Sequence, residues 1–290
     1  MDPAGITPLS DRMTAPISVV IPAYNAERLL ADAIQSVLAQ SLSVAEIIVI
    51  ADSCTDRTEQ IAKELGATVL THQGRSMAAG LNLGVEYSSQ AWIALLDADD
   101  VWKEEKIELQ WKAIQECPAA ALVACDMFTV QDEKVTRLSD RELSERWDHT
   151  QSVEVGEHAR FLEEVPGEFL PRFNIHTPTA ILRRDVFSTV GCFDETLIFG
   201  QTLEFFARVL ARFPLLFVER PLVDHRRHDD NHTRDPDAYR SVYISIIERM
   251  LKHPERYPAG TGEAYRARLK RDFHQFERGL WKEKIRQVIS

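Results

Sequence analysis

The chain has 290 residues, 44% hydrophobic and 8% aromatic, which is the composition of a globular protein with room for a sizeable core. Its 45 acidic residues against 34 basic ones give a net charge of −11, which argues against a general nucleic-acid binder because such proteins carry a basic surface. The four cysteines lack CxxC spacing, which argues against a thiolate zinc site and favours free thiols in a reducing compartment.

The N-terminal residues 1–15 lack the apolar core of a signal peptide, so we expect a flexible leader. No apolar run approaches the roughly 20 residues that a membrane-spanning helix needs. We therefore expect a cytoplasmic protein. The last predicted helix is richer in Lys and Arg than in acids, and this basic face is either solvated, which we favour, or rests peripherally on an anionic membrane.

Strands and helices alternate from Ile17 onward. Short apolar or β-branched runs predict strands at 17–22, 46–51, 68–72, 91–96 and 121–130. Apolar residues at helical spacing predict helices at 26–40, 56–66, 76–88 and 103–116. This alternation predicts an α/β fold, with a mainly parallel Rossmann-like sheet flanked by helices on both faces.

The pattern is less regular in the second half of the chain. The charged stretch 131–173 is interpreted as a loop-and-helix insertion. After it, the sequence predicts a strand, a short helix and a turn within 179–195, a helix at 202–213 and an edge strand at 214–228. Helical spacing returns from Tyr239 and again from Leu269, which predicts a C-terminal helical extension.

Polar side chains follow three of the predicted strands, in the segments AYNAE, DSCTD and DADD. Ligands of parallel α/β sheets bind beyond the carboxyl ends of the strands, so these segments should converge. Asp97 and Asp99 can point the same way, and carboxylate oxygens suit Mn²⁺ or Mg²⁺ bridging to a diphosphate. The alternative is a solvated acidic turn in which Asp100 caps a helix that starts near Lys103. The convergence of three strand ends favours the metal site.

The segment PAYNAE contains neither GxGxxG nor a P-loop, so phosphate charge must be neutralised by the metal. Together with IIVIADSCTDRT, GRSMAAGLNLGV and IALLDADDVW, the block SVVIPAYNAERLLADAIQSVLAQ resembles the family 2 glycosyltransferases, which have the GT-A fold. The resemblance implies a nucleotide-sugar-binding half at 16–130, an acceptor-side half at 131–235 and C-terminal helices at 236–290.

The resemblance also assigns residues to the donor site. It implies that Asp52 hydrogen-bonds the nucleobase, commonly uracil, although Ala51 and Cys54 depart from the usual VDDGSTD block. Asp97 and Asp99 would form the DxD motif, with Asp99 the more direct metal ligand. Arg226 and His228 match a pattern near the diphosphate. The residues expected to bind the nucleotide are Pro22, Ala23, Tyr24, Glu27, Asp52, Arg75, Asp97 and Ala98.

Inverting transfer needs a base that deprotonates the acceptor hydroxyl. The family commonly supplies an aspartate six residues before an arginine that matches Arg208, but Gln201 and Thr202 stand there in this chain. Glu204 is the substitute candidate. The alternative is a first-turn glutamate that interacts with the helix dipole, with Thr202 as the N-cap.

Two further features remain open at this stage. A histidine metal site from His225, His228 and His232 is weighed against solvated loop residues, which we favour because the spacing fits no rigid element. Trp102 either stacks on sugar or acceptor, or covers the core.

The resemblance implies a metal-dependent enzyme that transfers a sugar, commonly UDP-linked, to a hydroxyl of a glycan, lipid-linked, peptide or small-molecule acceptor with inversion. Because Thr202 replaces the base, the alternative is a catalytically impaired nucleotide-sugar-binding or partner protein of the same fold. A nucleotidyltransferase shares the α/β plan but would generally have a Gly-rich basic loop after the first strand. No nucleic-acid partner is expected.

Overall fold

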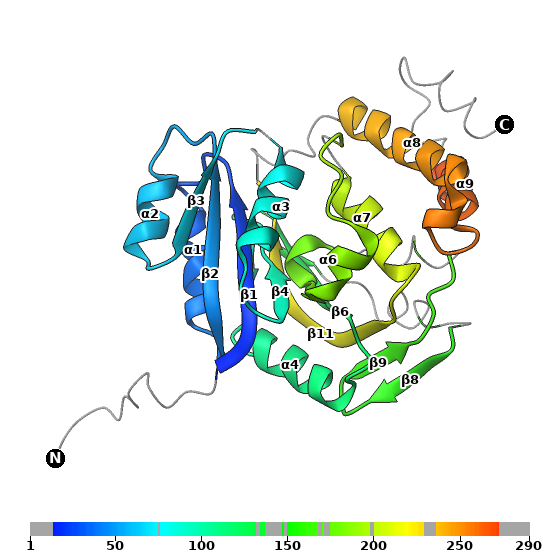
Figure 1. Ribbon diagram of the computed structural model, residues 1–290, viewed down its shortest axis with the longest axis horizontal. Coiled ribbons are helices and arrows are strands. Elements are labelled where there is room, and N and C mark those ends of the chain that lie inside the picture. The colour runs from blue at the N-terminus through cyan, green and yellow to red at the C-terminus, as the bar shows by residue number, and fades with distance from the viewer. Residues whose placement is uncertain are drawn as a thin grey trace.

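The computed structural model describes residues 14–74, 76–131, 134–136, 147, 150–167, 170, 175–197, 200–228 and 236–272. They form an 11-stranded sheet in the order β3-β2-β1-β4-β10-β6-β11-β9-β8, with β5 beside β11 and β7 beside β6 (Figure 1). The strands are β1 (Thr14–Ala23), β2 (Ser43–Asp52), β3 (Thr68–His72), β4 (Trp92–Leu95), β5 (Val101–Trp102), β6 (Leu122–Gln131), β7 (Lys134–Thr136), β8 (Ser152–Val155), β9 (Ala159–Leu162), β10 (Ile181–Arg183) and β11 (Leu215–Arg226).

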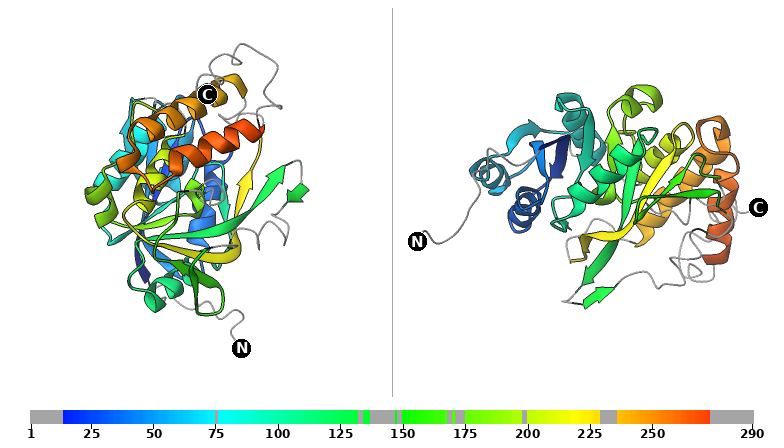
Figure 2. Two further views of the ribbon diagram at one scale, coloured as in Figure 1. Left: turned by 90° about the vertical axis from the view of Figure 1, so that its right-hand side faces the viewer. Right: turned by 90° about the horizontal axis from the view of Figure 1, so that it is seen from below.

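Helices cover both faces of this sheet, and Figure 2 shows the two layers from other sides. The core on one face takes side chains from α3, α6, α7 and α8, and the core on the other takes them from α1, α2 and α4. The helices are α1 (Leu30–Leu38), α2 (Thr58–Glu64), α3 (Met77–Tyr87), α4 (Lys106–Glu116), α6 (Asp185–Val190), α7 (Gln201–Leu210), α8 (Pro236–Lys252) and α9 (Thr261–Asp272), with 3₁₀ turns η2 (Thr177–Thr179) and η4 (Pro254–Arg256).

The strand directions confirm a mixed sheet with a largely parallel core. β1 runs parallel to β2 and β4, β2 runs parallel to β3, and β6 runs parallel to β11. β10 is antiparallel to both β4 and β6, and β9 and β8 add an antiparallel edge. The predicted elements up to residue 130 are confirmed, with boundaries that shift by a few residues.

Two predictions for the second half were wrong. The segment 214–228 is not an edge strand, because β11 lies between β6 and β9; Pro221 is accommodated inside the sheet where the register with β6 shifts. The described part of 131–173 contains the strands β7, β8 and β9, which the loop-and-helix interpretation did not include, whereas Trp147 is helical. These short pairings join residues from separate parts of the chain, which local periodicity does not reveal.

A close contact sets the position of α3 over the sheet. A Cβ atom added to Gly84 would lie 2.3 Å from Cγ1 of Val20 on β1 and 2.8 Å from Cδ1 of Ile50 on β2. Only glycine allows this approach. It brings the start of α3 to the carboxyl ends of β1 and β2, where the predicted nucleotide pocket lies.

None of the helices in the described part of the chain combines the length and the hydropathy needed to cross a bilayer.

One cation is fully buried in the core. Lys106, at the start of α4, donates from Nζ to Oε1 of Gln110 at 2.6 Å and lies 4.0 Å from the centre of the Trp102 ring. Burial lowers the pKa of this amine to about 8, from 10.5. The folded protein therefore releases this proton at a lower pH than the unfolded chain does.

We predict that the stability of the protein rises with pH between about 8 and 10.5 through Lys106. In this window the unfolded amine still binds a proton that the folded amine has lost, so raising the pH favours folding. The contribution amounts to about 3 kcal/mol across the window. Urea unfolding of the protein and of Lys106→Met at several pH values measures this contribution. The difference between the two free energies of unfolding removes the effect of all groups that titrate in both proteins. Parallel pH profiles for the two proteins would contradict the assignment.

Candidate active site

The carboxyl ends of β1, β2 and β4 lie together at one edge of the sheet, as predicted. Pro22 stands opposite Ile50 in the ladder between β1 and β2. Ile50 and Leu95 belong to the core beneath α3 and α7, and side chains alternate along strands. Asp52 and Asp97, each two residues farther on, are therefore expected on that same face. This arrangement brings two predicted site carboxylates to one side of the sheet edge.

Asp52 is held by groups from three segments. Its Oδ2 accepts a hydrogen bond from the backbone N–H of Ser76 at 3.0 Å, and its Oδ1 accepts one from Oγ of Ser53 at 3.0 Å. Nδ1 of His72, at the end of β3, lies 3.4 Å from Oδ1. The sequence reasoning did not single out His72; its position as the last residue of the predicted strand 68–72 was the available signal. The carboxylate of Asp52 is thus held in place where the ends of β2 and β3 meet the start of α3.

The loop after β1 presents one open aromatic side chain. Ala23 is buried, whereas Tyr24 is 52% exposed and accessible to a flat ligand. Glu27 points elsewhere: its Oε2 accepts from the backbone N–H of Arg57 at 3.2 Å, and its own N–H donates to Oδ2 of Asp56 at 3.0 Å. Glu27 therefore joins the loops after β1 and β2.

The aspartates of the DADD segment differ in burial and in their hydrogen-bond partners. Oδ1 of Asp97 is buried and has no hydrogen-bond partner in the part of the chain that the structure describes. Burial, together with the charges of Asp100 and Asp99, holds the pKa of Asp97 well above its usual range. Asp99 has its Oδ2 3.1 Å from Nε2 of His228. Ala98 between them is buried.

These oxygens fit a divalent cation that also binds substrate. Within the described ranges, no group of three or more His, Cys, Asp or Glu residues is arranged to hold a metal by itself. Mg²⁺ and Mn²⁺ commonly take one or two carboxylates and complete their shell with substrate phosphates and water. The orphaned oxygen of Asp97 beside Asp99 matches this incomplete type of site, because a cation would stabilise the charged form that burial disfavours.

The alternative role for Asp100 as a helix cap was wrong. The following helix α4 begins at Lys106, with Glu105 as its N-cap residue. Asp100 is fully buried, and its Oδ1 accepts from the backbone N–H of Arg226 at 2.9 Å and lies 3.2 Å from Nδ1 of His225. The reason is the short strand β5, which directs the turn toward β11 before α4 starts.

Two histidines lie next to this turn: His225 contacts Asp100, and His176 contacts His225. The hydrogen bond with Asp100 raises the pKa of His225, whereas burial lowers the pKa of His176 to about 4, with a contribution from His225. The rings of these two histidines lie 5.4 Å apart. His176 is therefore neutral at physiological pH.

Of the remaining predicted residues, Arg226 is described, whereas two others are not. The Arg226 guanidinium donates to the carbonyl of Asp99, to Oδ2 of Asp32 at 2.7 Å and to the carbonyl of Leu29 at 3.3 Å, so it ties β11 to the start of α1. Arg75 and His232 lie outside the described residues.

Trp102 covers the core and does not present a ring to a ligand. Its side chain is buried against the α1 and α4 face, and its Nε1 donates to the carbonyl of Pro178 at 2.9 Å. The core interpretation of this residue is therefore correct.

Glu204 lies on α7 as the sequence indicated, but inside a buried ion-pair network. Both of its carboxylate oxygens accept hydrogen bonds from Arg208, at 2.9 to 3.0 Å. Oε1 also accepts from the hydroxyl of Tyr257 at 2.9 Å, and Nη2 of Arg256 lies 3.8 Å away. The side chain has no exposed surface. We infer that Glu204 acts as a structural partner of Arg208, since a base must reach its proton donor.

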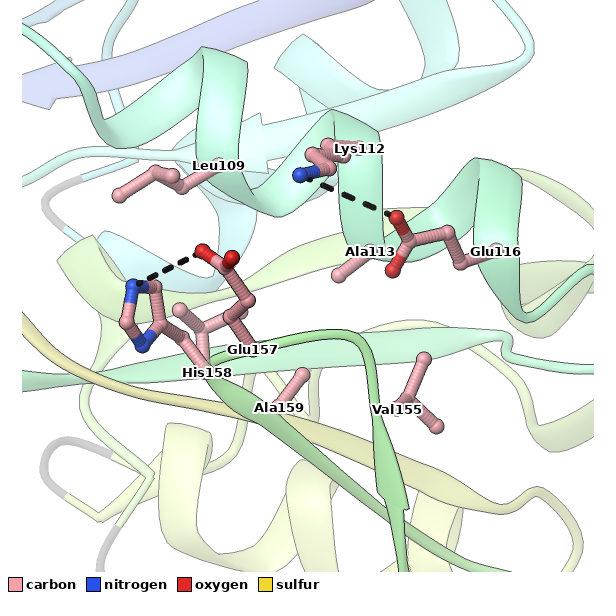
Figure 3. Close-up of a pocket in the computed structure, with 9 residues that line it drawn as sticks. Leu109, Lys112, Ala113, Glu116, Val155, Glu157, His158 and Ala159 are labelled. Carbon is pink, nitrogen blue, oxygen red and sulfur yellow. Dashed lines mark ion pairs between the residues drawn. The ribbon is translucent and has the colours of Figure 1, made fainter.

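A small cavity of about 90 Å³ lies elsewhere, between α4 and the β8–β9 hairpin (Figure 3). Its charged rim is paired within itself, Lys112 with Glu116 and Glu157 with His158. It contains none of the predicted site residues.

We predict that Glu204→Gln destabilises the fold by about 3 kcal/mol, because it leaves the Arg208 cation buried without its counter-charge. Tyr257→Phe removes one hydrogen bond and should cost about 1 kcal/mol. Urea unfolding measures both, with Glu86→Gln, an exposed glutamate on α3, as the control. A Glu204→Gln protein of unchanged stability that loses turnover would instead restore Glu204 as a base.

Comparisons with known proteins agree with this geometry. The profile of the family described as Glycosyl transferase family 2 matches residues 18–191. An uncharacterized glycosyltransferase of Rickettsia typhi is 23% identical over 244 residues, which span 81% of this chain and 73% of that protein. An uncharacterized glycosyltransferase of Rickettsia conorii is 36% identical over 251 residues, 81% of this chain and 39% of that protein.

Solved structures show the same fold. S. aureus TarS 1–349 in complex with UDP-GlcNAc gives a TM-score of 0.67 at 16% identity, covering 94% of this chain and 81% of that one. The complex of the same protein with UDP gives 0.63 at 17% identity, covering 92% and 76%. With the profile match over more than half of its length, the chain belongs to the family 2 glycosyltransferases and has the GT-A fold.

Proposed function

We propose that the protein is a metal-dependent, inverting glycosyltransferase that uses a nucleoside-diphosphate sugar, with uridine as the nucleoside. The observation that supports this most strongly is the buried oxygen of Asp97 beside Asp99, which has no hydrogen-bond partner among the described residues, at the sheet edge that also carries Asp52. An ionised pair of carboxylates there needs a cation, and a cation with few protein ligands needs phosphate oxygens.

The uridine assignment rests on the chemistry of Asp52. A carboxylate only accepts hydrogen bonds when ionised, and the uracil ring offers one N–H donor on its pairing edge. Ser76 and Ser53 hold this carboxylate in place from the protein side. Tyr24, exposed in the loop after β1, offers a face against which a nucleobase can stack. TarS was solved in complex with UDP and with UDP-GlcNAc, which supports the same choice.

In the proposed reaction, this chain positions the donor and stabilises the leaving group. Asp97 and Asp99 would hold Mn²⁺ or Mg²⁺, which supplies positive charge to the diphosphate as it departs. His228, 3.1 Å from Asp99, would orient that carboxylate. An acceptor oxygen attacks the anomeric carbon from the side opposite to the diphosphate, which inverts the configuration.

We predict that UDP with Mn²⁺ raises the melting temperature, and that Asp97→Asn and Asp99→Asn each remove most of this shift. The ligand stabilises the fold by mass action, and the two carboxylates supply the protein's share of the metal shell. Thermal unfolding with UDP, Mn²⁺ or both measures the effect. Asp185→Asn, an exposed acid on α6, is the matched control and should respond like the unmodified protein. Equal shifts in all four proteins would refute the metal site.

We predict that Asp52→Asn weakens UDP binding at least tenfold and reduces the preference for UDP over CDP. Replacing one carboxylate oxygen by NH₂ removes an acceptor for the uracil N–H and introduces a donor. Isothermal titration with both nucleotides in the presence of Mn²⁺ measures the two affinities. An unchanged UDP-to-CDP ratio would show that Asp52 does not recognise the base.

A further inference from the structure

The first turn of α7 lies where the family places its base, and it carries no accessible carboxylate. Gln201 and Thr202, which occupy the two positions, are neutral. The acid one residue beyond Leu203 is Glu204, which is fully buried and neutralised by Arg208. This end of the site therefore has no acid on α7 that can take a proton from a hydroxyl.

The same turn presents backbone donors instead. Gly200 precedes the helix with a φ of 70°, and no side chain caps it. Among the described residues, the N–H of Glu204 is the first of α7 to bond back along the chain, to the carbonyl of Gly200 at 3.0 Å. The N–H groups of Gln201, Thr202 and Leu203 thus precede the first intrahelical bond. Three such donors and the positive end of the helix dipole attract an anion.

The side-chain amide of Gln201, at the start of α7, has an unsatisfied hydrogen-bonding atom. Gln201 is only 5% exposed, and its Oε1 is buried without a hydrogen-bond partner among the described residues. Its Nε2 lies 3.0 Å from Sδ of Met77, which is a weak acceptor. Because helical side chains lean toward the N-terminus, this amide lies at the head of α7. Rotation of the amide exchanges its oxygen and NH₂ group, so it can turn a donor toward a ligand.

Contacts connect this helix end to the donor pocket. Met77, which touches Gln201, is the first residue of α3. The residue before it, Ser76, donates its backbone N–H to Asp52. The start of α7 therefore borders the nucleotide site and not a remote surface.

We propose that the acceptor is a phosphate monoester, held at the start of α7 by the Gln201 amide and the first-turn N–H groups. The proposal rests on the transferase function and names its acceptor class. A phosphate monoester is largely a dianion at neutral pH, because its second pKa is about 6. Its oxygen is already ionised, so no base is required. A carboxylate at position 202 would repel this dianion, which accounts for the neutral pair.

The electron balance is simple. A phosphate oxygen lone pair forms a bond to the anomeric carbon, and the bond from that carbon to the diphosphate oxygen breaks. The electron pair leaves with the nucleoside diphosphate. No proton moves, and the product is a glycosyl phosphodiester.

The test offers two phosphates and one alcohol as acceptors. The protein is incubated with Mn²⁺ and either UDP-glucose or UDP-GlcNAc, and with decyl phosphate, inorganic phosphate or decanol. Phosphorus NMR detects a phosphodiester from decyl phosphate or a sugar 1-phosphate from inorganic phosphate. Decyl phosphate alone indicates a lipid-like acceptor, whereas both phosphates indicate recognition of the phosphate group itself. We expect transfer to at least one phosphate and none to decanol.

A matched pair of variants isolates the charge at position 202. Thr202→Asp should lower transfer to phosphate at least tenfold and remove the rise in melting temperature that decyl phosphate gives in the presence of UDP and Mn²⁺. Thr202→Asn, of the same size but neutral, should keep both. Gln35→Glu, on the exposed side of α1, adds the same charge elsewhere and should change neither.

Three outcomes would overturn the acceptor class. One is the use of no phosphate by a protein that still responds to UDP with Mn²⁺. Another is equal activity of Thr202→Asp and Thr202→Asn with phosphate. The third is transfer to decanol, because an alcohol acceptor would need a base that α7 does not supply. A protein without any response to UDP and Mn²⁺ would instead refute the proposed function.

Discussion

The buried ion pair between Glu204 and Arg208 is the constraint on which the acceptor side of the molecule depends. Besides Glu204, the Arg208 guanidinium donates to the carbonyls of Val190, Gly191 and Cys192, which follow α6 or end it. Tyr257 reaches the same carboxylate from the segment after α8. Three parts of the chain thus share one desolvated charge pair, and removing either partner would leave the other charge buried. The pair anchors α7 to the end of α6 and to the segment after α8.

The donor side depends on the opposite situation, in which charge is left uncompensated by the protein. Asp97 has a buried oxygen without a protein donor among the described residues, and like charges at Asp99 and Asp100 add to its cost. Asp99 lies 3.1 Å from Nε2 of His228, and Asp100 is satisfied by the backbone of Arg226 and by His225. Such a partly satisfied carboxylate cluster is costly in the free protein and becomes favourable when a cation binds. The ion pair of Glu204 and Arg208 is therefore complete without a ligand, whereas the carboxylates of Asp97 and Asp99 would be completed by the proposed cation.

This difference bears on the chemistry that the family 2 fold performs here. A hydroxyl acceptor needs a base near the anomeric carbon, and the position that would supply it carries Gln201 and Thr202. The nearest acid on the helix is used to hold the fold. A nucleophile that arrives already ionised removes the need for a base, and the neutral, donor-rich start of α7 is suited to it. The absence of a base and the proposed phosphate acceptor thus both follow from the neutral residues Gln201 and Thr202 at the start of α7.

The sequence alone determined the α/β class, the order of the elements to residue 130 and the common edge of the sheet at which β1, β2 and β4 end, because periodicity and parallel strand ends are local properties with one geometric outcome. It did not determine that β11 lies inside the sheet, since strand neighbours are chosen by pairings between distant segments. It also left two roles open for Glu204. The tertiary structure shows Glu204 buried against Arg208 and Tyr257, which the sequence could not indicate because Tyr257 lies 53 residues away and burial depends on the whole packed core.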